Sequence, residues 1–105
     1  MKISEVTRLE RLHTKDVDEL FDAIASLRTR EECYSFFEDA LTVKEILDTA
    51  QRLKAAKMLR GGASYSEVCK ETGMSTATIS RVSKALEHGA GGYALVIDRT
   101  EKGNV

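Results

Sequence analysis

The residues best suited to chemistry lie on one predicted helical stretch between positions 76 and 84. At about 100° per residue, Ala77, Arg81 and Lys84 share one side of that helix, and Thr76 and Ser80 flank them. Hydroxyl and guanidinium groups hydrogen-bond to the edges of bases, ammonium groups neutralise phosphates, and a small residue such as alanine permits close approach. This face is therefore suited to contact with a nucleic-acid duplex.

The segment 64–87 must position that face, and its spacing predicts two short helices joined by a tight turn. Ser64 and Glu67 form a capping box that starts the first helix. Gly73 ends it, because glycine adopts the left-handed backbone at little cost, and Ser75 is suited to cap the second helix. The inner faces would form a small core of Val68, Met74, Ile79 and Val82, with Cys69 where the helices cross. This is the pattern of a helix-turn-helix, although an ordinary helical hairpin has the same spacing.

Charge is distributed unevenly along the chain. The net charge is −1, yet residues 51–84 contain seven basic and two acidic residues, which leaves the remainder at −6. The basic block coincides with the hairpin, so it favours a phosphate-binding face and an acidic body. Lys57, Arg60, Lys70 and Lys84 are the predicted phosphate contacts. Lys57 and Arg60 would equally complement the helix dipole at the end of the preceding helix.

The rest of the chain predicts an all-α domain. Capping signals at Asp16, Thr29 and Thr42 start helices that reach about residues 28, 41 and 59. Tyr93–Ile97 suggests a short final helix, with a strand as the alternative. We therefore expect a weakly ordered arm at 1–13, one helical domain at 14–98 and a disordered tail at 99–105.

The two predicted helices that begin at Asp16 and Thr29 have large apolar faces for their length, and the connections between helices are short. One chain would leave Phe36 and Phe37 poorly covered, so we expect a second copy to complete the core. Cys33 and Cys69 lack metal-ligand spacing and are predicted to be buried, reduced thiols.

Several classes of function are excluded at this level. The sequence has no apolar run of membrane-spanning length and no hydrophobic N-terminal signal, which predicts a cytoplasmic protein without a membrane partner. It has no glycine-rich phosphate loop, metal-ligand spacing or nucleophile–base pair, so we expect no enzymatic activity, metal or cofactor.

Three segments together resemble the Trp-repressor superfamily, and most closely its YerC/YecD branch. They are EECYSFF, AQRL and STATISR, between residues 31 and 81. The resemblance covers about residues 16–98. It implies a Trp-repressor-like helical bundle that forms an intertwined homodimer, with two recognition helices entering successive major grooves.

The resemblance also implies an effector pocket, because Trp repressor binds L-tryptophan as corepressor. The matching positions are Thr42, Arg52 and Arg81, and their residue types agree. The next position departs from the pattern: Val82 replaces a glycine that leaves room for the indole ring. A branched side chain there would fill the pocket, and overpacking an indole against it would cost about 1–3 kcal/mol or more, so we expect no useful tryptophan binding. Arg52 and Arg81 would then serve as phosphate contacts or surface ion pairs, and Arg81 could also contact guanine.

These observations together predict a sequence-specific DNA-binding transcriptional regulator that binds a double-stranded operator as a homodimer. Of the two modes of regulation, we expect repression. The alternative is a helical protein-interaction module without specific DNA readout.

Overall fold

The computed structural model describes residues 11–102, which contain six α-helices, labelled α2 to α7, and no strand. The chain divides into two compact units, residues 1–42 and 43–105. The predicted all-α class is correct. The predicted arm at 1–13 lies outside the described residues except for 11–13.

The N-terminal unit contains α2, Lys15–Ala25, and α3, Arg30–Ala40. The Thr14 hydroxyl caps α2 by accepting from the Val17 N–H at 3.2 Å, two residues before the start predicted at Asp16. The helix also ends at Ala25 rather than near residue 28. The Ser26 hydroxyl donates to the Ala23 carbonyl at 2.6 Å, a local bond that competes with continuation of the helix.

The start of α3 follows the prediction, with one difference. Thr29 Oγ1 accepts from the Glu32 N–H at 3.1 Å, as a capping box requires. The Glu32 carboxylate accepts from the Arg28 N–H at 2.8 Å instead of from the cap residue. The backbone of Arg28 is thus part of the α3 start, which is a second reason why α2 stops before it.

No side chain of α2 or α3 is buried within the single chain. Phe36 and Phe37 contact each other edge to face, with ring centroids 5.3 Å apart. Phe21 and Tyr34 are more than half exposed. Cys33 is also exposed, so its predicted burial is wrong for the single chain: it lies on a surface that the described part of this unit leaves open.

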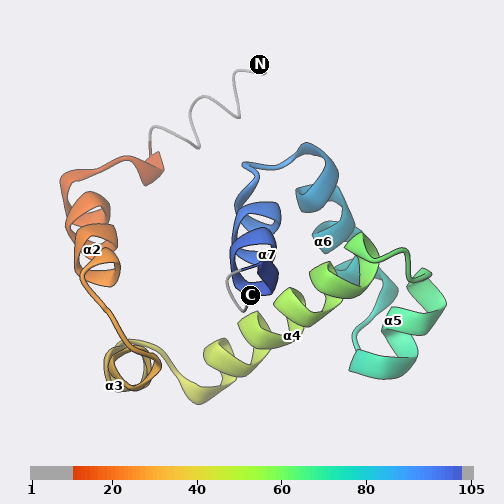
Figure 1. The fold of residues 1–105 in the computed structure, drawn as a ribbon, viewed down its shortest axis with the longest axis horizontal. Helices are drawn as coiled ribbons and strands as arrows, with labels where there is room; N and C mark the ends of the chain where they lie inside the picture. The colour runs from red at the N-terminus through yellow and green to blue at the C-terminus, as the bar shows by residue number, and fades with distance from the viewer. Residues whose placement is uncertain (1–10, 103–105) are drawn as a thin grey trace. The chain divides into compact units, whose positions relative to one another are not determined.

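The C-terminal unit is built on the longest helix, α4, Val43–Arg60. It packs against α5, Tyr65–Thr72, α6, Thr76–His88, and α7, Gly92–Lys102 (Figure 1). Gly62, at φ 97°, lies in the turn after α4. The final segment is a helix rather than a strand.

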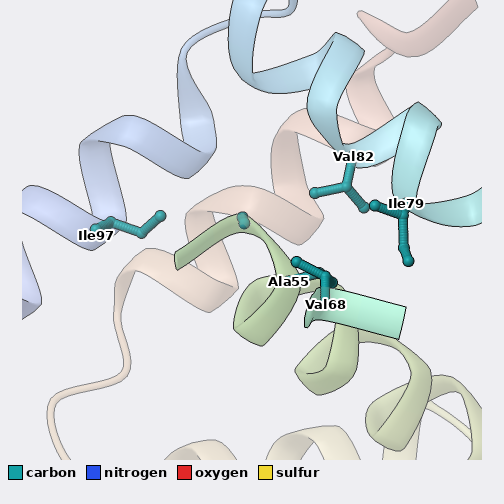
Figure 2. Packing of buried hydrophobic residues seen from close by; sticks show 6 residues of the cluster. Ala55, Val68, Ile79, Val82 and Ile97 are labelled. Carbon is teal, nitrogen blue, oxygen red and sulfur yellow. The ribbon is translucent and has the colours of Figure 1, made fainter. Parts of the chain in front are cut away.

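One small core holds these four helices together. Figure 2 shows its labelled members: Ala55 on α4, Val68 on α5, Ile79 and Val82 on α6, and Ile97 on α7. All five are between 0% and 3% exposed. The predicted hairpin core is therefore correct, and the half-buried Met74 and Cys69 pack against it.

The tail predicted from residue 99 is wrong over its first four residues, because α7 continues to Lys102. Ile97 anchors this helix in the core, and the Thr100 hydroxyl donates to the Val96 carbonyl at 2.8 Å. A helix fixed by a buried residue extends through the following turn at little further cost.

Candidate nucleic-acid interface

The outer face of α6 is polar and exposed. Thr76, Ala77, Ser80, Arg81 and Lys84 are all exposed. The opposite side of the same helix carries two members of the core, as Figure 2 shows. Burial of one side fixes the rotation of α6 about its own axis, so the polar side must face outward. The structure thus brings together the five residues predicted to contact DNA from this helix.

The capping box at the start of α5 forms as predicted. Ser64 Oγ accepts from the Glu67 N–H at 3.1 Å, and the Glu67 carboxylate accepts from the Ser64 N–H at 3.1 Å. These hydrogen bonds favour the charged carboxylate, so the backbone and side chain of Ser64 lower the pKa of Glu67. The start of the first hairpin helix is therefore fixed by local chemistry.

The turn between α5 and α6 depends on Gly73. Its φ of 73° lies in the left-handed region, and its N–H donates to the Cys69 carbonyl at 2.8 Å. A Cβ at this position would meet no atom within 4 Å, so the requirement for glycine comes from the backbone angle and not from crowding. Ser75 then caps α6 by accepting from the Thr78 N–H at 3.2 Å.

The predicted phosphate contacts separate into two groups. Lys57, Lys70 and Lys84 are exposed, and none forms an ion pair with another described residue. Arg60 is different, because its guanidinium lies 2.9 Å from an Asp98 carboxylate oxygen and donates to the Ala94 carbonyl at 2.9 Å. Arg60 therefore joins α4 to α7, which favours a structural role for this residue over the predicted phosphate contact.

Two of the three residues predicted for the effector pocket line one hollow. Arg52 and Arg81 border a cavity of about 250 Å³ together with Val82 and Tyr93. Thr42 belongs to the N-terminal unit and directly precedes α4. Val82 is 3% exposed and is part of the core, so its side chain occupies the space that a glycine would leave open. The remaining volume is below the roughly 300–1,000 Å³ usual for small-molecule sites.

A second hollow, of about 380 Å³, lies between α4 and the hairpin turn and has no counterpart in the sequence predictions. The Lys44 ammonium donates to the Asp48 carboxylate at 2.7 Å on its α4 side. This hydrogen bond, together with the positive charges of Lys44 and Arg52, lowers the pKa of Asp48. A spacing of four residues on a helix could have suggested this pair, but not the hollow, which needs the position of the distant turn.

No described helix is both long enough and apolar enough to cross a membrane. Within residues 11–102, His, Cys, Asp and Glu side chains do not gather in groups of three that could hold a metal ion.

The fold and the exposed face of α6 define a helix-turn-helix protein with a Trp-repressor-like arrangement. A family model described as Trp repressor protein matches residues 15–101, and the chain belongs to this family. The YerC protein of Bacillus subtilis (strain 168) is 46% identical over 95 residues, which cover 90% of this chain and 91% of YerC. The chain therefore falls in the YerC-related branch, as the resemblance indicated.

Two solved structures are also similar. A TrpR-like protein from Eubacterium eligens ATCC 27750 is 47% identical, with a TM-score of 0.84, and the match covers 88% of this chain and 95% of that one. A structure from Staphylococcus aureus is 48% identical, with a TM-score of 0.83, and the match covers 89% and 93%.

Proposed function

We propose that this protein is a sequence-specific DNA-binding transcriptional regulator that acts through its helix-turn-helix. The observation that carries the proposal is the two-sided character of α6: Ile79 and Val82 are buried in the core, while hydroxyls, Arg81 and Lys84 are exposed on the other side. Membership of a family named after a repressor supports the same role and favours repression. A protein of this kind acts in the cytoplasm.

The contacts would divide by chemistry. The exposed Thr76, Ala77, Ser80 and Arg81 would contact bases, whereas the exposed Lys57, Lys70 and Lys84 would contact phosphates. Base contacts specify a sequence, and phosphate contacts supply affinity that is independent of sequence and falls with salt. Arg81 can also contact a phosphate from its position.

The working unit would be a homodimer. The two described helices of the N-terminal unit, α2 and α3, contain no buried residue, and on α4 Val43 and Leu47 are 71% and 59% exposed. Apolar surface of this extent in a single chain indicates a protein partner. A second copy satisfies it and would present two recognition helices to one duplex. Sedimentation of Leu47→Asp, with Ser80→Asp as the exposed control, tests this: only the Leu47 variant should dissociate.

We further propose that L-tryptophan is not an effector. Val82 fills the position that an indole ring would need, and the space between Arg52 and Arg81 is small.

Selection of bound sequences from a random duplex pool tests the main proposal. The purified wild-type protein should enrich a defined motif and should bind random duplex at low salt with an affinity that falls as salt rises. The alternative is a helical module that binds another protein. It would show neither enrichment nor salt-dependent affinity for random duplex.

A further inference from the structure

The last residue of α5 makes two hydrogen bonds with a single hydroxyl group. Thr72 Oγ1 donates to the Val68 carbonyl at 2.6 Å and accepts from the Met74 N–H at 3.2 Å. The first bond lies within α5, and the second crosses to the residue just before the α6 cap. One hydroxyl therefore ties the end of the first hairpin helix to the start of the second.

Packing restrains this turn only on the side where Met74 contacts the core. Thr72, Gly73 and Met74 all border the hollow of about 380 Å³ beside α4, so one side of the turn lacks packed neighbours. Where packing is absent, hydrogen bonds determine the backbone path. Two of them hold this turn: the Thr72 hydroxyl bond to Met74, and the bond from the Gly73 N–H to the Cys69 carbonyl.

We propose that Thr72 is a positioning residue for sequence readout, an inference that rests on the proposed DNA-binding function. Its hydroxyl sets the direction in which α6 leaves the turn. Base edges are read only when side chains lie within hydrogen-bond distance, whereas phosphates attract charge over a wider range. Loss of the hydroxyl therefore impairs the choice of sequence more than the affinity for DNA in general.

The test compares Thr72→Val, which removes the hydroxyl and keeps the shape, with Thr72→Ser, which keeps the hydroxyl. Each variant is titrated against the duplex selected by the wild-type protein and against a random duplex of equal length. One hydrogen bond of typical strength changes the population of the competent turn by about fivefold. Thr72→Val should lose about that factor on the selected duplex and little on the random one.

Thr49→Val is the matched control. The Thr49 hydroxyl also donates to the carbonyl four residues earlier, at 2.7 Å, but it lies in α4 away from the turn. This variant and Thr72→Ser should keep the wild-type ratio of the two affinities. The proposal would be overturned if Thr72→Val kept the wild-type ratio of the two affinities, for example through an equal loss on both duplexes. It would also be overturned if Thr72→Ser did not keep that ratio.

Amide hydrogen exchange of Met74, measured without DNA, separates this inference from the proposed function. The exchange of this amide should be faster in Thr72→Val than in the wild type and unchanged in Thr72→Ser. If the wild type selects no duplex, the proposed function fails and the readout role fails with it, while the Met74 amide still reports whether the hydroxyl holds the turn. Unchanged exchange in Thr72→Val would refute that hold even in a protein that binds DNA well.

Discussion

Replacement of Gly73 by alanine isolates the energetic requirement of the hairpin turn. At φ 73° an alanine must adopt the left-handed backbone, which costs about 1–2 kcal/mol. The Cβ would meet nothing within 4 Å, so no steric term is added. Alanine also restricts the unfolded chain more than glycine does, which offsets about 0.4–1 kcal/mol of this cost. The net expected destabilisation is about 1 kcal/mol.

Gly92 and Gly89 provide two reference points. A Cβ at Gly92 also meets open space, and its φ is not in the left-handed region, so Gly92→Ala should be neutral or slightly stabilising. A Cβ at Gly89 would clash with the backbone carbonyl of Ala85, so Gly89→Ala should destabilise by a different route. The Gly73 variant should therefore be less stable than the Gly92 variant by about 1–2 kcal/mol, the cost of the left-handed backbone.

Denaturant unfolding at one fixed protein concentration, followed by far-ultraviolet circular dichroism, measures these differences. A fixed concentration matters because the proposed dimerisation would couple stability to concentration. If Gly73→Ala proved as stable as Gly92→Ala, the turn would not depend on the left-handed conformation, and the reasoning about the hairpin would be refuted.

Three further predictions test other parts of the account. Arg60→Ala should lower the free energy of unfolding by up to about 1 kcal/mol, the usual contribution of an exposed ion pair, and should leave the salt dependence of DNA binding unchanged. Lys84→Ala should instead reduce the slope of log affinity against log salt by about 0.9. Equal slopes for both variants would contradict the assignment of Lys84 to a phosphate and of Arg60 to the α4–α7 contact. Because the folded state lowers the pKa of Glu67, this carboxylate contributes stability above its ordinary value of 4.5, and the contribution is lost as the pH falls through the lower folded value. Acid titration of stability should therefore be flatter in Glu67→Gln, and an unchanged profile would count against the capping box. Calorimetry should detect no binding of L-tryptophan at micromolar concentrations, and a micromolar affinity would overturn the blocked pocket.

The local parts of this structure could be predicted from the sequence, because their causes lie within a few residues. The Ser64–Glu67 box needs only three residues, and the turn at Gly73 needs only one glycine with a hydroxyl cap after it. The buried and exposed sides of α6 followed from its period alone, so the candidate face was found with its five residues.

The remaining features depend on contacts between distant segments. Arg60 was predicted to be a phosphate contact because its partner, Asp98, is 38 positions away and no local sequence pattern joins them. The end of α7 at Lys102 was missed because the burial of Ile97, which anchors the helix, is a property of the packed core. The exposure of Cys33 has the same origin, since burial depends on what covers a helix and not on the residue type alone.

The central claim is that the exposed side of α6 reads DNA. A mobility-shift titration of the wild type and Arg81→Ala on the selected duplex tests it most directly, with Thr49→Val as the control on another helix. The account predicts that Arg81→Ala weakens binding at least fivefold, about the effect of one lost hydrogen bond, while the control binds as the wild type does. Equal affinity of all three proteins for that duplex would contradict the claim.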